Sequence, residues 1–239
     1  MSLLQVHALE ACHGQLKAVK GIDLTVAPGE RLALVGANGA GKTTFLKTIA
    51  GIHAASAGKV IFEGQDITHL TANQRVAAGI ALVPEGRRLF GSMTVADNLR
   101  VALSAKRTGF WNFDTVIDAF PQLKPKLSAL ASSLSGGQQQ SVAIGRALMT
   151  NPQVLLLDEV SLGLSPIAVQ GVYQSLQSLM AGQTTVILVE QDLQRTFSVA
   201  HRIACMLEGQ IVARGRTDEL TREEVMGYYF GHRPAKETT

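Results

Sequence analysis

The sequence predicts an α/β fold: a parallel β-sheet covered on both faces by helices, with an antiparallel β region at its edge and an inserted α-helical subdomain. Three observations support this. Continuous apolar runs at residues 31–35, 154–157 and 185–189 have the length and composition of strands buried on both faces of a parallel sheet. Segments of helical pattern separate them. Between about residues 94 and 149 the pattern is helical throughout.

The antiparallel region comes first along the chain. Short apolar stretches at residues 3–8 and 22–26 alternate with turn signals at residues 13–14 (His-Gly) and 28–29 (Pro-Gly). The strand at 31–35 then leads through a glycine-rich turn into a helix. We expect that helix to run from Lys42 to about Ala50.

The later elements have clear boundaries. Asn151-Pro152 ends one helix. Ser165-Pro166 begins another, with serine as N-cap and proline at the first helical position. We expect residues 1–90 and 150–231 to form one core, residues 91–149 the inserted helical subdomain, and residues 232–239 a polar tail.

Composition excludes several classes of protein. Of 239 residues, 46% are apolar and 17% charged, which is typical of a compact globular chain. Aromatic residues make up only 5%, which argues against a stacking platform for single-stranded nucleic acid. The formal charge of +3 is small enough to serve solubility alone. Cys12 and Cys205 lie far apart without metal-ligand spacing, which favours a reducing compartment.

Membrane insertion is not expected of this chain. The first residues lack the basic segment and apolar run of an export signal. No apolar run approaches the ~20 residues needed to span a bilayer. If the protein acts at a membrane, another chain must do the spanning.

The segment Gly36–Thr43, GANGAGKT, matches the phosphate-binding P-loop pattern and lies between the predicted strand and helix. Glycines let consecutive N–H groups point inward, and the helix N-terminus adds its dipole. Lys42 would bind the β- and γ-phosphates, and the Thr43 hydroxyl would bind Mg²⁺. The predicted nucleotide-binding residues here are Gly36, Asn38, Gly39, Ala40, Gly41, Lys42, Thr43 and Thr44.

A second motif, Val154–Glu159, is a buried strand that ends in two carboxylates. In open α/β sheets, ligands bind at the edge where the carboxyl ends of the strands lie. Asp158 is predicted to contact Mg²⁺, and Glu159 to orient and deprotonate the attacking water. These two motifs predict a hydrolase or kinase that uses Mg-ATP or Mg-GTP.

The run Leu134–Gln140, LSGGQQQ, narrows the class. Ser-Gly-Gly at a helix start is a second anion nest without a lysine, which is useful when two chains face each other head to tail. The run resembles the signature motif of ABC ATPases, and the resemblance covers residues 4 to about 231. It implies that Ser135, Gly136, Gly137 and Gln138 contact the nucleotide held by the partner subunit.

The loop Val83–Phe90, VPEGRRLF, narrows the subfamily. Most ABC ATPases have glutamine where Glu85 stands. With GANGAGKTT, AIGRALM and SLGLSP, this loop resembles the second ATPase subunit of branched-chain amino acid importers. The resemblance implies that Glu85 lies near Mg²⁺ and the attacking water, and that its loop links the site to the permease.

The chain departs from the family pattern at two site positions. His13 stands where an aromatic ring usually stacks on adenine, and a surface histidine without a role is the alternative. Gln191 stands where a histidine usually contacts the γ-phosphate. Glutamine can donate the same hydrogen bond but cannot become cationic. We therefore keep Gln191 among the catalytic residues.

We thus expect an ATP-hydrolysing subunit of an importer of amino acids, of the branched-chain kind by resemblance. Its partners would be permease subunits, a second and different ATPase subunit and, indirectly, a solute-binding protein, but no nucleic acid. It would lie peripherally on the cytoplasmic face of the inner membrane, with ATP and Mg²⁺ as cofactors. One alternative is a soluble ABC ATPase acting on nucleic acid or ribosomes. Another is a regulatory subunit that binds ATP without hydrolysing it.

Overall fold

A computed structural model describes residues 2–180 and 184–229. Contacts divide the chain into two compact units. The first consists of the chain up to Leu70 together with the part from Ile187 onward, and the second is Thr71–Val186. Each unit carries part of the predicted chemistry.

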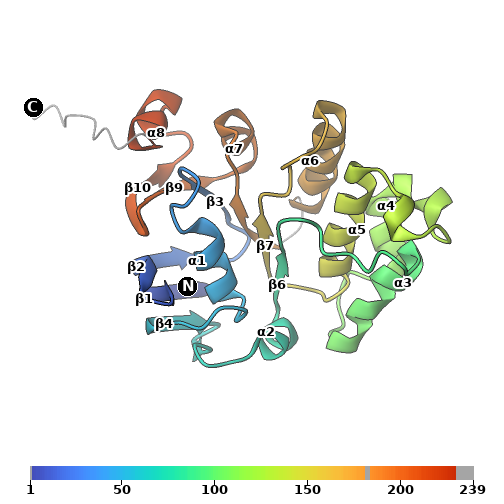
Figure 1. Ribbon diagram of the computed structural model, residues 1–239, viewed down its shortest axis with the longest axis horizontal. Helices are drawn as coiled ribbons and strands as arrows, with labels where there is room; N and C mark the ends of the chain where they lie inside the picture. The colour runs from blue at the N-terminus through green and yellow to red at the C-terminus, as the bar shows by residue number, and fades with distance from the viewer. Residues whose placement is uncertain (1, 181–183, 230–239) are drawn as a thin grey trace, which may run out of the picture. The chain divides into compact units, whose positions relative to one another are not determined.

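The first unit contains the predicted antiparallel region (Figure 1). Its strands are β1 (Leu4–His13), β2 (Leu16–Val26), β4 (Ala57–Phe62) and β5 (Gln65–Asp66), in the order β2-β1-β4-β5. The first two strands are longer than their apolar stretches and form one hairpin, in which His13 pairs with Leu16. Gly14 makes the turn possible with φ of 59°.

The first unit also contains the strand and helix around the phosphate motif. Strand β3 (Arg31–Val35) runs parallel to β9 (Arg202–Leu207), which pairs antiparallel with β10 (Gln210–Arg216). Helix α1 (Lys42–Ile49) follows β3 directly. The remaining helices are α7 (Leu193–Val199) and α8 (Arg222–Tyr229). Strand β8 (Thr185–Val189) begins in the second unit and ends in the first.

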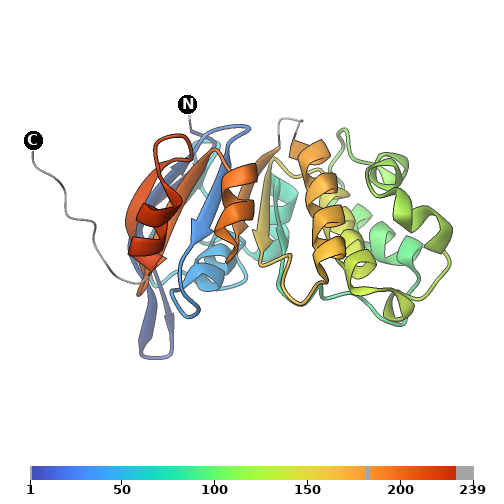
Figure 2. The same ribbon diagram turned by 90° about the horizontal axis from the view of Figure 1, so that it is seen from above.

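In the second unit, two parallel strands accompany most of the helices (Figures 1 and 2). The strands are β6 (Ile80–Val83) and β7 (Val154–Asp158). The α-helices are α2 (Ala72–Ala78), α3 (Val95–Arg100), α4 (Phe113–Ala119), α5 (Gly136–Leu148) and α6 (Pro166–Met180). Three short 3₁₀ helices lie between them: η1 (Val101–Ala105), η2 (Pro121–Lys126) and η3 (Ala131–Ser133).

Helix α5 is the centre of the helical packing. Both views show α6 beside it. A Cβ atom at Gly145 would lie 2.8 Å from Val116 Cγ1 and 3.1 Å from Leu99 Cδ2. Glycine here therefore lets α5 pack tightly against α3 and α4. Val142, Ile144 and Leu148 of the same helix are fully buried.

These elements confirm the α/β class and the helical pattern from residue 94 to 149. The two contact units follow boundaries different from the predicted domains, 1–90 with 150–231 and 91–149, and that division stays a prediction. The predicted tail, 232–239, lies outside the described residues. Within residues 2–180 and 184–229, no helix is long and apolar enough to cross a membrane.

Candidate nucleotide-binding and catalytic site

The P-loop turns sharply between β3 and α1, in a conformation that requires glycine. At Gly36, φ is 151° and an added Cβ would lie 2.1 Å from the Met206 carbonyl oxygen. At Gly41, the N-cap of α1, φ is 99° and a Cβ would lie 2.3 Å from the Ala18 carbonyl oxygen. Side chains are excluded at both places, so the loop backbone can pack closely against these two carbonyl oxygens. This is the geometry of an anion cradle.

The lysine of the P-loop is folded over the loop itself. Lys42 is only 4% exposed. Its ammonium donates hydrogen bonds to the carbonyl oxygens of Gly36, at 2.7 Å, and Ala37, at 3.0 Å. The Lys42 ammonium thus lies at the loop itself, where it can donate to an anionic ligand.

Gln191, two residues after strand β8, contacts the P-loop. Its side-chain amide donates to Asn38 Oδ1 at 3.1 Å. Its backbone N–H donates to the carboxylate of Glu190, which is almost fully buried, at 3.0 Å. Two residues that are 153 positions apart in the sequence are thus brought together at the P-loop. The amide of Gln191 is placed to donate to an oxygen bound in the loop.

His13 is exposed at the end of β1 and contacts the first turn of α1. Its Nε2 lies 3.0 Å from the Thr44 hydroxyl. Its ring is 4.6 Å from the ring of His53, tilted by 45°. His53 in turn makes a hydrogen bond of 3.1 Å with the Cys12 carbonyl oxygen. His13, the residue predicted to stack on adenine, is therefore one of two imidazole rings that lie against each other.

In the second unit, the predicted carboxylates end strand β7. Asp158 is fully buried. Glu159, the next residue, has the left-handed φ of 48°, a conformation that costs a non-glycine residue roughly 1–3 kcal/mol. The buried Val160 follows it. The chain thus turns sharply at the predicted base as it leaves the sheet.

The signature run forms a capped helix start. Ser135 is the N-cap of α5, and its hydroxyl accepts the Gln138 N–H at 3.4 Å. The Gln138 side chain accepts the Ser135 N–H at 3.1 Å, which completes a capping box. Gly137 leaves no room for a side chain, because its Cβ would lie 2.8 Å from Ala168 Cβ. Local packing and capping therefore account for part of the motif without any ligand.

The Glu85 loop is tied to the signature helix. Gly86, Arg87 and Arg88 all have positive φ, of 76°, 62° and 47°. The Arg87 guanidinium donates to Gln139 Oε1 at 2.9 Å. Arg146, also from α5, donates to the Arg88 carbonyl oxygen at 2.8 Å. Glu85 itself is exposed at the start of this strained loop.

Arg146 connects that loop to a cavity in the second unit. Its guanidinium lies 5.6 Å from the centre of the Phe90 ring, which is 49% exposed. Burial lowers the pKa of Arg146. The cavity has a volume of about 470 Å³ and is lined by α2, β6, η1 and α5. Arg146 lines it together with Val76, Leu82, Val101 and Ala147.

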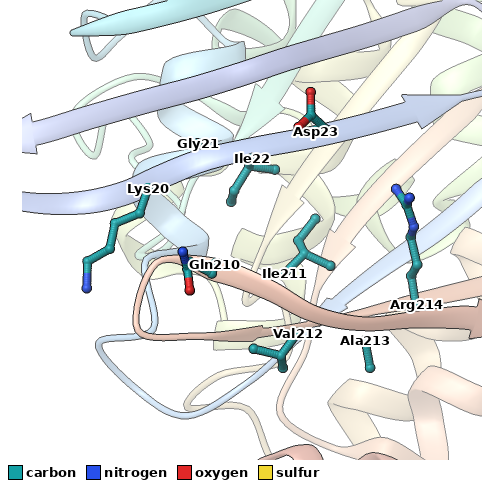
Figure 3. Close-up of a pocket in the computed structure, with 9 residues that line it drawn as sticks. All are labelled: Lys20, Gly21, Ile22, Asp23, Gln210, Ile211, Val212, Ala213 and Arg214. Carbon is teal, nitrogen blue, oxygen red and sulfur yellow. The ribbon is translucent and has the colours of Figure 1, made fainter.

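A second cavity, of about 530 Å³, lies in the first unit between the edge strands β2 and β10 (Figure 3). Ile22 and Ile211 point toward each other across it. The Lys20 N–H donates to the Gly209 carbonyl oxygen at 2.8 Å, which links β2 to the turn before β10. The Gly209 N–H donates to the Ala40 carbonyl oxygen at 2.9 Å. The hydrogen bond from Gly209 thus connects the turn before β10 to Ala40 of the P-loop.

Comparison with known proteins agrees with these features. The family model described as "ABC transporter" matches residues 19–161. The chain belongs to the ABC transporter family. It is therefore an ATPase, and the match contains the P-loop, the signature helix and the two carboxylates.

Three relatives span almost the whole chain. The high-affinity branched-chain amino acid transport ATP-binding protein BraG of Pseudomonas aeruginosa is 37% identical, covering 96% of this chain and 100% of BraG. The LivF protein of Archaeoglobus fulgidus, a probable protein of the same kind, is 32% identical over 93% of this chain and 95% of its own. The lipopolysaccharide export system ATP-binding protein LptB of Haemophilus influenzae is 30% identical, and the match covers 97% of this chain and 98% of LptB.

A solved ATP-binding cassette of an ABC transporter in its ADP conformation has the same fold. Its TM-score is 0.80 and its sequence identity 28%, over 97% of this chain and 99% of that chain. This ABC ATPase therefore has the fold of a cassette that binds nucleotide. The expected class of enzyme is confirmed.

Sequence reasoning missed two residues that the structure adds to the site. His53 is forty residues from His13, and only the path of the chain brings the rings together. Arg146 lies on the largely buried helix α5, where a lone arginine among apolar residues was the available signal. In the described residues, no group of three or more His, Cys, Asp or Glu side chains could hold a metal ion without other donors.

Proposed function

We propose that this ABC ATPase drives the import of amino acids, with branched-chain amino acids as the substrate. The observation that carries the proposal is the relationship to BraG, which extends over the full length of BraG at 37% identity. LivF supports the same substrate at 32%. The P-loop, signature and carboxylates are all intact, which favours hydrolysis over a purely regulatory binding role.

In this proposal ATP binds through its phosphates at the P-loop. The phosphate oxygens replace the two carbonyl oxygens that now accept from Lys42. Gln191 donates a hydrogen bond to the γ-phosphate from its position beside Asn38. The adenine stacks on His13, which Thr44 and His53 hold in place. Base–aromatic stacking would contribute roughly 1–3 kcal/mol.

Hydrolysis needs a metal and a base. Hydroxyl and carboxylate oxygens are the donors that Mg²⁺ prefers, and Thr43, Asp158 and Glu85 supply them. Bound there, Mg²⁺ would neutralise charge on the phosphates. Glu159 accepts a proton from the attacking water, a role that contributes about 10²–10⁴ in rate. Glu159 directly follows the fully buried Asp158, which supports a base next to the proposed metal ligand.

The signature implies a second ATPase subunit. Ser135, Gly136, Gly137 and Gln138 would contact the nucleotide of the partner, as the family resemblance implies. Because the importers that this chain resembles have two distinct ATPase chains, we propose a heterodimer. Each of the two composite sites would then join one P-loop to the other subunit's signature.

A permease would dock at the cavity lined by α2, β6, η1 and α5. This cavity is lined mostly by apolar residues, with one guanidinium, that of Arg146, and the polar side chains of Asn73, Ser104 and Thr150. Phe90 lies exposed against the same guanidinium. Arg146 also holds the Glu85 loop. A permease segment in the cavity would therefore act on that loop directly. The subunit would lie peripherally at the cytoplasmic face of the inner membrane, with a solute-binding protein as an indirect partner.

Lipopolysaccharide export is the second candidate function, because LptB is 30% identical over nearly the whole chain. Uptake of radiolabelled leucine in the source cell, with the gene deleted, separates the two. We expect uptake to fall and to return with the wild-type gene but not with Glu159→Gln. Normal uptake in the deletion strain, together with loss of surface lipopolysaccharide, would instead establish export.

A further inference from the structure

In the second unit, Phe110 exposes its ring beside the half-buried Trp111, and the ATPase site uses neither ring. The two rings belong to residues 106–112, KRTGFWN, between η1 and α4, and we call this segment the aromatic loop. Phe110 is 72% exposed. Its ring meets that of Trp111 edge-on, with centres 4.9 Å apart and an angle of 84° between the planes. Leu103, seven residues earlier, is also exposed, and exposed apolar side chains that gather on one surface mark contact with a protein or a membrane.

The loop is firmly held by its backbone. Asn151 Oδ1 accepts the Trp111 N–H at 2.8 Å, and Asn151 Nδ2 donates to the Trp111 carbonyl oxygen at 2.8 Å. Arg107 donates to the carbonyl oxygens of Asn151, at 3.1 Å, and Ala77, at 2.8 Å. Gly109 allows the close approach, because a Cβ there would lie 2.5 Å from Asn151 Oδ1. The loop thus presents Phe110 on a fixed support.

The sequence on the N-terminal side of the rings is basic, and Arg100 there lies 4.0 Å from Asp97 Oδ1. Residues 98–113 contain Arg100, Lys106 and Arg107 and no carboxylate. The Arg100 guanidinium lies 5.1 Å from the centre of the Phe113 ring. Leu103, just before the loop, is 56% exposed and adds apolar surface. Acidic residues return only at Asp114, in the first turn of α4.

We propose that the aromatic loop rests on the headgroup region of an anionic lipid bilayer. Tryptophan and phenylalanine rings are favoured at that depth, and Lys and Arg are attracted to the negative surface. A protein partner fits the neighbouring cavity better, because that cavity is concave and apolar. Its lining includes Ser104 and Ala105, and the loop begins at the next residue. The proposal rests on the proposed peripheral location, and it adds a contact that needs no permease.

The chain contains a single tryptophan, Trp111, so its fluorescence reports on this loop alone. The full-length protein is mixed with vesicles of phosphatidylcholine containing phosphatidylglycerol, and separately with phosphatidylcholine alone. With the anionic vesicles we expect a blue shift, quenching by brominated lipid, and loss of both as salt is raised. Pure phosphatidylcholine should produce much weaker effects.

Matched variants assign the contact to the loop. Phe110→Ser should weaken binding to anionic vesicles about tenfold or more, because one large apolar side chain leaves the bilayer. Leu16→Ser is the control, since Leu16 is 70% exposed in the first unit. Lys106→Gln should weaken binding about fivefold, with Lys59→Gln as its control. Thermal unfolding of each variant verifies that it folds.

Each result decides the proposal. No blue shift with anionic vesicles, or equal losses for the loop and control variants, would overturn it. A shift seen only in vesicles that carry the permease would also overturn it, and would assign the loop to protein contact. Leucine uptake tests the proposed function independently, because vesicle binding of the isolated subunit requires neither ATP nor permease.

Discussion

Glu159 combines a catalytic assignment with an unusual backbone, since its φ is 48° directly after the buried strand β7. Replacing it with glutamine keeps the size of the side chain and removes the proton acceptor. We predict that Glu159→Gln lowers ATP hydrolysis by about 10²-fold or more while ATP binding survives. Phosphate release and nucleotide affinity are measured on the same preparation. Hydrolysis at the wild-type rate would show that another group is the base.

Two P-loop glycines form a natural pair for comparison. A Cβ at Gly36 would collide with the Met206 carbonyl oxygen, 2.1 Å away, whereas Gly39, with φ of 82°, has no such atom within 4 Å. We predict that Gly36→Ala destabilises the fold and abolishes ATP binding. Gly39→Ala should cost only about 1 kcal/mol in backbone strain. Chemical denaturation and ATP titration would reveal an error if the two variants behaved alike.

The imidazole pair permits a test of adenine stacking. His13→Ala removes the proposed stacking face, and we predict an affinity for ATP about fivefold or more weaker. His13→Tyr offers a larger ring and should restore or improve it. His53→Ala should have a smaller effect in the same direction, because His53 contacts the ring of His13. Unchanged affinity in all three would mean that His13 is a surface residue without a role.

At the scale of elements, the boundaries of helices and strands were predicted best where a residue type favours one structural position, as proline favours the first turn of a helix. Pro166 begins α6 and the Ser165 hydroxyl accepts the Ala168 N–H at 3.4 Å, as predicted. The apolar runs became β3, β7 and β8 almost residue for residue. The first hairpin extends beyond its apolar stretches, because exposed polar residues there continue the pairing.

Features that depend on distant contacts were not predictable from local pattern. The sequence predicts that Asn151 ends a helix, and Asn151 does follow α5. Its side chain also accepts the N–H of Trp111 in the aromatic loop, forty residues earlier. Likewise, the link of Gln191 to Asn38 required the resemblance to suggest it and the fold to supply it. Periodicity reports which face of an element is buried, and it contains no information on which loop lies opposite.

The start of β9 is predicted to be acid-sensitive. Burial, and then the nearby Arg31, lower the pKa of His201 from its ordinary value of 6.5. Its Nδ1 accepts the Arg31 N–H at 3.3 Å, which requires a neutral ring. As pH falls through 6.5, the unfolded chain takes up the proton first, so stability is lost.

His201→Asn should therefore reduce that loss, because asparagine can accept the same hydrogen bond without titrating. Denaturation at about pH 7.5 and about pH 5.5 measures the free energy of unfolding on both sides of the ordinary histidine pKa. The difference between the two pH values should be smaller for the variant than for the wild type. Equal differences would exclude His201 as the titrating group.

At the scale of the whole molecule, the role proposed for the signature helix would make a single chain incomplete, because the helix would bind the nucleotide of another subunit. The capping box at Ser135 satisfies that helix start within the chain, so folding alone does not require the partner nucleotide. The same serine and glycines are proposed to bind the phosphates of another subunit. Because the start of α5 is satisfied without a ligand, it would keep its structure while the proposed dimer opens and closes in each cycle.

The working pair is predicted to be a heterodimer. Glu85 and Gln191 differ from the usual family residues, and the resemblance assigns both to the nucleotide of their own subunit, so a mixed dimer would contain them in only one of its two sites. A homodimer would contain them in both and would lack the usual histidine altogether. We predict that the isolated protein is monomeric, with slow turnover that rises when the second ATPase and the permease are added. With both ATPases present, Mg-ATP should close an interface of about 1,600 Å² or more. Light scattering with and without Mg-ATP measures this, and a stable homodimer, fully active without ATP-driven assembly, would contradict it.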